Sequence, residues 1–530
     1  MPDADADRGT LLDNFIDTGD YGVIEDFGRP ERFILGRTGA GKTALITKLQ
    51  AEHNNVIIIQ PESLSLGYVS NSTIIKAMAE LGVNFDLFFR LLWRHVLGVE
   101  ILKYHFGIND QEANATIIAR LKERFSKYNK RTNHARALSY LESWGSSFWQ
   151  DTDYRIKELT SKVESKIESS VGVQMSPLLA GLKGGKKISN EEKTEVIHLA
   201  QEVVNSVQIK ELADLIKMLD EAIDDKQKKY YLVIDKLDEK WVEDELRYKL
   251  IKALLETVKD FNAVEQVKPI VVLRNDLINR VYNLTRDVGF QEEKFSSLNL
   301  NIKWTKKQLI EMLDHRISYL VKKRYVKGGV THIDILPKNI NGVRAIDYMI
   351  DRTLMRPRDV INFFNFCIEE AVDSPIIEEA MVLKAEREYS RDRRSSILDE
   401  WYADYPSLDH WDILLKGLEN EFFISDISLK QIEELCLTFN GDKKPLPDKI
   451  RELLDLVLDE KLTYAQLRQE LVRIFYSVGY VGVNFSDHET PIWSYQPRKS
   501  LLTDEINDDS ILCVHPCFWS CFNIKASKKT

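Results

Sequence analysis

The chain has 530 residues, of which 44% are hydrophobic and 29% are charged, values typical of a folded protein and not of a disordered one. Its 73 Lys and Arg against 83 Asp and Glu give a formal charge of −10, which excludes a protein that coats nucleic acid or anionic membrane through its overall charge. The first ten residues contain no apolar run, and the five cysteines are few and odd in number, so we expect no secretory signal, no disulfide framework and a cytoplasmic location.

The first predicted elements alternate between short apolar strands and helices, a pattern typical of a mostly parallel α/β sheet. Strands are expected at 32–35, 55–60, 230–234, 269–273 and 298–302, with a helix at 42–53. Between the second and third strands, apolar residues recur at helical spacing, which predicts helices at 85–106, 113–127, 135–148, 153–169 and 190–224. This stretch is therefore expected to be a large helical insertion. The most apolar of these helices, 85–106, carries too many charges to span a bilayer.

After the last strand the pattern becomes helical, with helices expected at 306–323, 341–351 and 357–371. A charged segment, Lys384–Arg394, is interpreted as a connector. Beyond it we expect a helix at 464–476 followed by short strands at 480–485, 492–495 and 511–514. A helix followed by two or three such strands is the outline of a winged helix.

The strongest motif lies between the first strand and the first helix of the sheet pattern. It matches G-x-x-x-x-G-K-[ST] and consists of Gly36, Arg37, Thr38, Gly39, Ala40, Gly41, Lys42 and Thr43. Glycines let backbone N–H groups curl around phosphate oxygens, and the helix that starts there adds its positive end. We expect Lys42 to reach the β- and γ-phosphates and Thr43 to bind Mg²⁺. Because the strand and helix that the motif requires flank it, a chance match is the weaker interpretation.

A carboxylate is expected at the end of a neighbouring strand. Five apolar residues precede Asp235, which is therefore the candidate magnesium carboxylate. Hydrolysis also needs a carboxylate that polarises the attacking water, but Lys236 stands at the usual position. Either Asp238 or Glu239 must serve, or catalysis is weak; the competing interpretation is a solvated loop.

Two further positions are candidate sensors of the γ-phosphate. Arg274 or Asn275 follows the strand at 269–273, where a plain turn is the alternative. Arg356 and Arg358 flank the Pro that opens the helix at 357–371, and this pair could reach the γ-phosphate or form a structural ion pair. Asp359 suits the positive end of that helix.

Several segments carry a family resemblance in combination. They are the strand end LVIDKLDEKW at 232–241, the helix start RPRDVINFFN at 356–365, AEREYS at 385–390 and HPCFW at 515–519. Together with the phosphate loop they resemble the AAA+/STAND-type P-loop ATPases of prokaryotes, and most of all a bacterial family related to the KAP and origin-recognition-type NTPases. The resemblance implies a sheet with an additional strand, a helical lid, a winged-helix-like C-terminal module and nucleotide-dependent switching or oligomerisation. Relatives of this kind often occur in bacterial defence against phages.

Metal and DNA sites are disfavoured. Cys513, Cys517 and Cys521 recur every four residues with His515 among them, which describes an apolar helix face as well as a zinc site. Residues 401–530 contain 14 Lys and Arg against 21 Asp and Glu, a net charge of −7 that suits DNA poorly. The better basic candidates are the segment 384–394 and the loop with Lys183, Lys186 and Lys187, although the first is more simply a solvated connector.

These observations predict an α/β protein with an additional-strand P-loop NTPase sheet. We expect an ATPase core at 1–70 and 228–303, a helical insertion at 71–227, a helical lid and connector at 304–395, and a winged-helix-like domain at 396–530. The expected function is that of a switch that uses ATP and Mg²⁺ and acts on a partner protein, with a homo-oligomer and a separate effector or regulatory protein as the expected partners. A nucleotide-gated scaffold with little hydrolysis and a DNA-stimulated ATPase remain alternatives, and no membrane partner is expected.

Overall fold

The structure is a computed structural model that describes most of the chain outside the middle of the predicted insertion. The described residues are 8–63, 82–108, 132–144, 161, 165, 169, 194, 197–198, 215–239, 241–242, 244–285, 293–324, 329–439, 448–484, 491–496 and 510–526. The predicted helix at 113–127, most of the helices at 153–169 and 190–224, and the loop with Lys183, Lys186 and Lys187 lie outside this set.

The chain divides into two compact units. The sheet unit comprises Gly19–Arg37 and Leu45–Ile302, and the C-terminal unit comprises Met1–Thr18, Thr38–Ala44 and Lys303–Thr530. The phosphate loop is thus shared, since its first two residues belong to the sheet unit and the rest to the C-terminal unit. No described helix combines the length and the apolar character that crossing a membrane requires.

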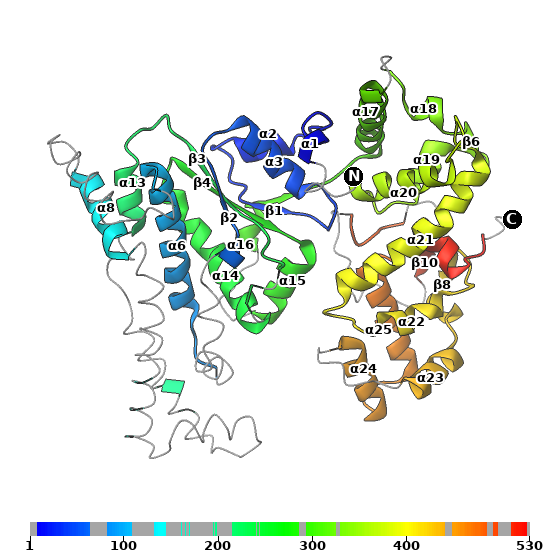
Figure 1. Cartoon of the computed structure of the whole chain (residues 1–530). Helices are drawn as coiled ribbons and strands as arrows, with labels where there is room; N and C mark the ends of the chain where they lie inside the picture. The colour runs from blue at the N-terminus through cyan, green and yellow to red at the C-terminus, as the bar shows by residue number, and fades with distance from the viewer. Residues whose placement is uncertain are drawn as a thin grey trace. The chain divides into compact units, whose positions relative to one another are not determined.

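A five-stranded parallel sheet organises the sheet unit (Figure 1). Its strands are β1 (Phe33–Leu35), β2 (Val56–Ile59), β3 (Tyr230–Ile234), β4 (Val267–Leu273) and β5 (Asn299–Asn301), in the order β2-β3-β4-β1-β5. Every residue of β3 and β4 is buried, as expected for central parallel strands covered on both faces. In this order β4 lies between β1 and β3. The predicted strands therefore form the sheet, with bounds shifted by one or two residues.

Helices complete this unit. They are α2 (Asp20–Glu25), α3 (Lys42–Glu52), α6 (Asp86–Phe106), α8 (Thr132–Trp144), α13 (Leu215–Ala222), α14 (Asp244–Asp260), α15 (Asn275–Leu284) and α16 (Glu293–Ser296), of which α3 begins within the loop segment of the other unit. Figure 1 shows α6 beside α14, where the Trp93 indole donates to the Leu250 carbonyl at 2.8 Å. The described helices of the insertion share one apolar core with the sheet.

A buried lysine makes the sheet unit sensitive to pH. Lys268 of β4 is fully buried, and its Nζ donates to the carbonyls of Val23 and Asp26 at the C-terminal end of α2, at 2.9 and 2.6 Å. Burial, followed by the charge of Arg32, lowers the pKa of Lys268 to about 7 from an ordinary value of 10.5.

We expect the free energy of unfolding to rise between about pH 7 and 10, because the unfolded lysine then binds a proton that the folded one does not. Lys268→Met should remove this part of the rise, measured by denaturant unfolding at pH 7.5 and 9.5. The control Lys229→Met changes a half-buried lysine whose solvent-exposed hydrogen bond also goes to a backbone carbonyl, that of Glu265. Equal pH dependence in wild type and Lys268→Met would contradict the prediction.

The C-terminal unit is mostly helical. It contains α1 (Arg8–Leu11), α17 (Lys306–Arg324), α18 (His332–Ile335), α19 (Ala345–Asp351), α20 (Pro357–Glu370), α21 (Glu379–Trp401), α22 (Leu408–Trp411), α23 (Leu429–Thr438), α24 (Lys449–Leu458), α25 (Tyr464–Val478) and α26 (Trp519–Phe522). Its strands are β6 (Asn339–Ile340), β7 (Val343–Arg344), β8 (Glu421–Phe423), β9 (Val481–Asn484) and β10 (Ile511–Val514). The last three form an antiparallel sheet in the order β8-β10-β9.

Three sequence expectations for this unit are corrected. The helix expected from Asn341 begins only at Ala345, because Asn341 and Gly342 both adopt positive φ and turn the β6–β7 hairpin. The strand expected at 492–495 is a single bridge between Ile492 and Val483. The three cysteines do not share a helix face, since Cys513 lies on β10 and Cys517 and Cys521 lie in the short helices that follow.

The segment Lys384–Arg394 is not a solvated connector. It forms the middle of α21, which buries Ala385, Tyr389 and Arg393 along one side. Its neighbour Arg394 binds the buried Asp412 through two contacts of 2.7 and 2.8 Å. The buried Arg393 and the partly buried Arg394 are therefore neutralised by carboxylates of the same unit, and the exposed Lys384 and Arg391 pair with Glu370 and Glu388.

Candidate functional site

The phosphate loop connects β1 to α3. Gly36 donates its N–H to the Leu273 carbonyl of β4 at 3.4 Å, so the loop starts at the carboxyl edge of the sheet. Gly39 and Gly41 have φ of +79° and +101°, which other residue types adopt only with strain. Lys42 and Thr43 are the first two residues of α3. Two of the three glycines of the motif, Gly39 and Gly41, thus lie where the backbone requires them.

The predicted acidic residues follow β3 at the same edge of the sheet. Asp235 accepts the N–H of Lys236 at 2.8 Å, and Lys236 itself has a φ of +62°, an unusual value for a residue with a side chain. A tight turn follows, in which Glu239 donates its N–H to the Lys236 carbonyl at 3.2 Å. Asp235 belongs to the sheet unit, whereas the other predicted metal ligand, Thr43, belongs to the C-terminal unit.

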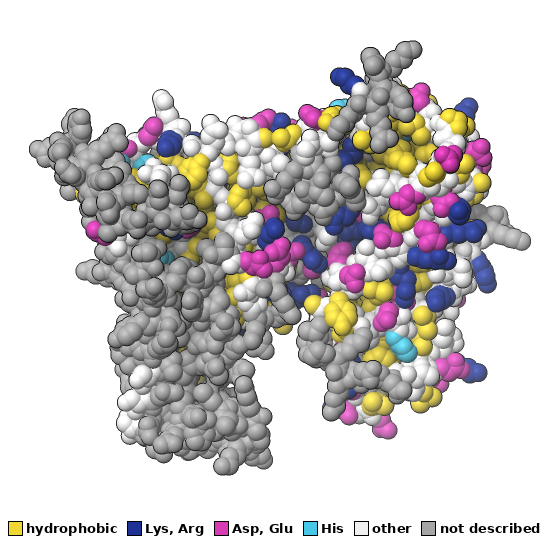
Figure 2. Space-filling view, in the orientation of Figure 1, with side chains coloured by type: hydrophobic (Ala, Val, Ile, Leu, Met, Phe, Trp, Pro, Cys, Tyr) yellow, Lys and Arg dark blue, Asp and Glu magenta, His cyan; other side chains and the backbone are white. Residues whose placement is uncertain are grey.

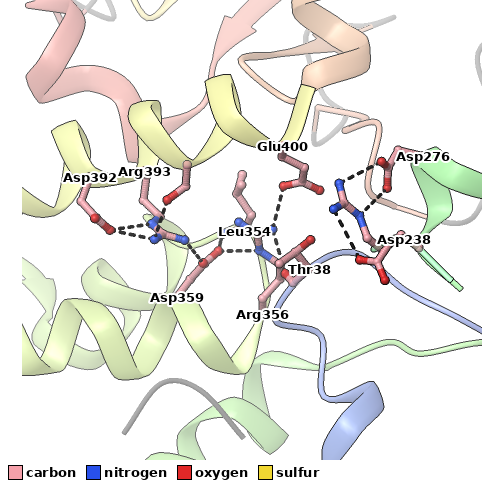
Figure 3. A network of polar contacts seen from close by, with 11 residues as sticks. Thr38, Asp238, Asp276, Leu354, Arg356, Asp359, Asp392, Arg393 and Glu400 are labelled. Carbon is pink, nitrogen blue, oxygen red and sulfur yellow. Dashed lines mark hydrogen bonds and ion pairs between the residues drawn. The ribbon is translucent and has the colours of Figure 1, made fainter. Parts of the chain in front are cut away.

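Each candidate catalytic acid lies beside a cation. Glu239 Oε1 is 3.5 Å from Lys236 Nζ. Asp238, labelled in Figure 3, has its Oδ2 3.6 Å from Arg274 Nη1. Both acids are 41% exposed, so solvent weakens these pairs. The two acids therefore differ in partner, and each is available for a second contact.

Arg274 is held mainly by its own neighbour. Its Nε and Nη2 donate to the two carboxylate oxygens of Asp276 at 2.9 and 2.8 Å, a bidentate arrangement at the start of α15. The alternative sensor Asn275 has a buried side-chain oxygen with no hydrogen-bond partner among the described residues. The structure thus brings Arg274 together with Asp238, while Asn275 Oδ1 retains an unused acceptor.

Arg247 is a residue of this region that the sequence did not reveal. It lies on α14, is buried, and its Nη1 donates to the carbonyls of Asp238 and Glu239 at 3.4 and 3.2 Å. It fixes the backbone of the turn that carries both candidate acids. No spacing or motif distinguishes it from the other charged residues of its helix.

In the C-terminal unit, a buried ion network lies next to the phosphate loop (Figure 3). Arg356 Nη1 donates to the Thr38 carbonyl at 3.0 Å, and its Nε donates to Asp359 at 2.9 Å. Asp359 also accepts from Arg393 Nη1 at 2.8 Å, and Arg356 Nη1 lies 3.4 Å from Glu400. Arg356 therefore forms the structural ion pair that was one of the two interpretations of the arginine pair.

Burial and charge oppose each other in this network. Burial alone would raise the pKa of Asp359, yet the charges of Arg356 and Arg393 hold it below its ordinary value. Burial would likewise lower the pKa of Arg356, but Asp359 and Glu400 outweigh that effect and raise it. Arg356, Asp359 and Arg393 therefore stay ionised around neutral pH.

Arg358 packs on the loop through its aliphatic part. A Cβ atom added at Gly39 would lie 2.6 Å from the Arg358 Cβ, and the Arg358 N–H donates to the Gly39 carbonyl at 3.4 Å. Trp304, which no motif singled out, donates its indole N–H to the Ala40 carbonyl at 2.8 Å. The loop residues 38–40 are therefore contacted by side chains and backbone from the beginning and middle of the predicted lid.

The donor set suits a nucleotide with a divalent cation. A glycine-rich turn with two positive φ values before a helix provides N–H groups for phosphate, and Lys42 adds a positive charge. The Thr43 hydroxyl and the Asp235 carboxylate are oxygen ligands of the kind that Mg²⁺ prefers. Among the described residues, no group of three His, Cys, Asp or Glu side chains is placed to hold a metal ion by itself.

Comparisons with known proteins also indicate a P-loop domain. The profile of the KAP family P-loop domain matches residues 33–298, and that of the FunZ-associated C-terminal helical domain matches residues 307–398. The search of curated proteins found no significant match. A solved structure, a Walker-type ATPase of Pyrococcus abyssi, is similar at 12% identity over 96% of both chains, with a TM-score of 0.35.

Proposed function

This chain belongs to the KAP family of P-loop NTPase domains, and from that membership we propose that it is a Mg²⁺-dependent ATP-binding and ATP-hydrolysing switch. The observation that carries the proposal is the phosphate loop itself. Gly39 and Gly41 adopt positive φ in a turn between a buried parallel strand and a helix that opens on Lys42 and Thr43. ATP is preferred to GTP because the chain lacks an Asn-Lys-x-Asp guanine motif.

The proposed roles follow the chemistry of each residue. The backbone from Gly36 to Thr43 and the Lys42 ammonium hold the phosphates, while Thr43 and Asp235 hold the metal. Bound Mg²⁺ would neutralise charge that develops between the phosphates. Asp238 or Glu239 orients the attacking water, and Arg274 or Arg358 contacts the γ-phosphate.

The strand order supports this assignment. Because β1 and β3 belong to one parallel sheet, Gly36 and Asp235 follow strand ends at the same edge. The position of β4 between them supports the additional-strand class, in which the tip of the intervening strand carries a sensor. Arg274 and Asn275 follow that strand, and the unused acceptor of Asn275 supports keeping both residues as candidates.

A scaffold that binds ATP and hydrolyses little is the second candidate function. The observation that favours it is Lys236, which occupies the usual position of the catalytic acid. Lys236 has a positive φ, and its Nζ lies 3.5 Å from Glu239 Oε1. An acid held by a neighbouring ammonium orients water less well, because the lysine competes for its lone pairs.

Steady-state ATP turnover separates the two functions. The ATP turnover of wild type should exceed that of Lys42→Ala. Of the two variants Glu239→Gln and Asp238→Asn, the one that replaces the catalytic acid should lower kcat by about 10²- to 10⁴-fold, and the other should leave kcat nearly unchanged. Turnover no higher than that of Lys42→Ala, with ATP still bound, would leave the scaffold; loss of ATP binding in wild type would reject both functions.

We propose a protein partner for the residues after 395, within a winged-helix-like domain. The order β8-β10-β9, with helices between β8 and β9, supports that outline. Leu437 and Leu458, on α23 and α24, are 85% and 80% exposed, which supports an apolar contact. On the face shown in Figure 2, Lys, Arg, Asp and Glu side chains are interspersed over the C-terminal unit, which disfavours DNA.

The remaining parts of the proposal concern assembly and biological role. A homo-oligomer, a separate effector or regulatory protein, a cytoplasmic location and a role in bacterial defence against phages rest on the family resemblance. Mass measurement with and without ATP tests the oligomer. A DNA-stimulated ATPase is the outcome if DNA at low salt raises turnover.

A further inference from the structure

Three successive carbonyl groups of the phosphate loop are bound from outside the loop. Thr38 O accepts from Arg356 Nη1 at 3.0 Å, Gly39 O from the Arg358 N–H at 3.4 Å, and Ala40 O from the Trp304 indole at 2.8 Å. All donors lie between residues 304 and 358 and in the same compact unit as Thr38–Ala44. We call these three contacts the carbonyl clamp.

The planar peptide bond converts this clamp into a constraint on the N–H groups. In a trans peptide the carbonyl of one residue and the N–H of the next point in opposite directions. The described residues contain no cis peptide. Each carbonyl that a donor holds therefore directs the N–H group of the following residue, Gly39, Ala40 or Gly41, away from that donor. Successive N–H groups in such a turn form a concave anion site.

The donors of the clamp are themselves fixed. The Arg356 side chain is 5% exposed and is held by Asp359, which is fully buried and also binds Arg393 (Figure 3). A Cβ at Gly41 would lie 3.7 Å from the Trp304 ring, so the indole packs on the loop as well as donating to it. A preorganised turn loses less entropy when it binds phosphate than a mobile one.

We propose that Trp304 and Arg356 are positioning residues for the nucleotide phosphates: by holding the loop carbonyls, they keep the N–H groups aimed at the phosphate before it binds. This deepens the proposed function and rests on it. Neither residue needs to touch the nucleotide, so the effect must appear in the phosphate-dependent part of the affinity.

Trp304→Phe tests the clamp, because it removes one donor and keeps an aromatic ring. Calorimetric titration with Mg-ADP and with adenosine should show ADP bound about three- to tenfold more weakly, the range for one lost hydrogen bond, and adenosine bound as in wild type. The matched control is Trp401→Phe, which removes an indole N–H that has no hydrogen-bond partner among the described residues. It should leave both affinities unchanged.

The outcomes separate the clamp from the function. If wild type binds no ADP, the proposed function fails. If wild type and Trp304→Phe bind ADP equally well, the clamp is overturned. The clamp is also overturned if Trp304→Phe loses as much affinity for adenosine as for ADP. Arg356→Lys provides a second readout, since a lysine keeps the charge but not the fork that binds the loop carbonyl and Asp359 together. Arg356→Lys should also lower the affinity for ADP and leave the affinity for adenosine unchanged. An ADP affinity equal to that of wild type would contradict the clamp.

Discussion

Replacing Asp359 with asparagine should lower the free energy of unfolding of the C-terminal unit by about 3–5 kcal/mol, the usual cost of removing one partner from a buried ion pair. Asp359 is fully buried and binds Arg356 and Arg393, at 2.9 and 2.8 Å. The asparagine keeps the shape of the side chain but removes the buried carboxylate that the two largely buried guanidinium groups share. Arg356 then keeps only Glu400, at 3.4 Å, and Arg393 keeps Asp392, at 2.7 Å, which is 41% exposed. The loss is therefore one of charge compensation and not of packing.

Asp347→Asn is the matched control. Asp347 also binds two cations, Lys306 at 3.0 Å and Arg344 at 2.6 Å, but these pairs are more exposed to solvent. Its replacement should cost less than about 1 kcal/mol. Denaturant unfolding, with hydrogen exchange of peptides from α20 and α21 as the local readout, measures both variants. Equal costs for the two substitutions would contradict the importance of burial.

Gly39→Ala should weaken nucleotide binding by about 10- to 100-fold. The substitution meets two obstacles, a φ of +79° and an Arg358 Cβ 2.6 Å from the new methyl group. The left-handed backbone costs about 1–2 kcal/mol for a residue with a side chain. The contact with Arg358 must then be relieved by moving the loop or α20, and each 1.4 kcal/mol corresponds to a factor of ten in affinity.

Gly342→Ala separates strain from collision. Gly342 has the same φ of +79° in the same unit, yet nothing lies within 4 Å of its added Cβ. It should lose stability through backbone strain and bind nucleotide as wild type does. Titration of both variants with Mg-ADP is the measurement, and unchanged affinity in Gly39→Ala would show that the loop tolerates displacement.

The parts of the fold that the sequence predicted are those encoded by local patterns. Contiguous Val, Ile, Leu and Tyr residues predicted β3 and β4, and the spacing of glycines before Lys42 located the phosphate loop. The helix at 341–351 was predicted too early because apolar periodicity outweighed the Asn341-Gly342 turn signal, which was present in the sequence.

The contacts that organise the candidate site could not be predicted, because they join residues that are distant in the chain. Trp304 reaches Ala40 over 264 positions, and Arg393 reaches Asp359 over 34. Charge spacing reveals pairs three or four residues apart on one helix. The charge pattern of 384–394 therefore indicated a solvated connector. It gave no sign of the carboxylates that bind Arg393 and Arg394, because these lie on other elements.

The helix α21 also limits how the chain can vary in length. Its neighbouring residues Arg393 and Arg394 bind carboxylates on different elements, Asp359 in α20 and Asp412 after α22. One inserted or deleted residue before them would rotate the following part of the helix by about 100°, since an α-helix has 3.6 residues per turn. Both arginines would then leave their partners together. Homologous chains should therefore keep the length of α21 fixed, and loops of this unit are the places for inserted tags or fusions.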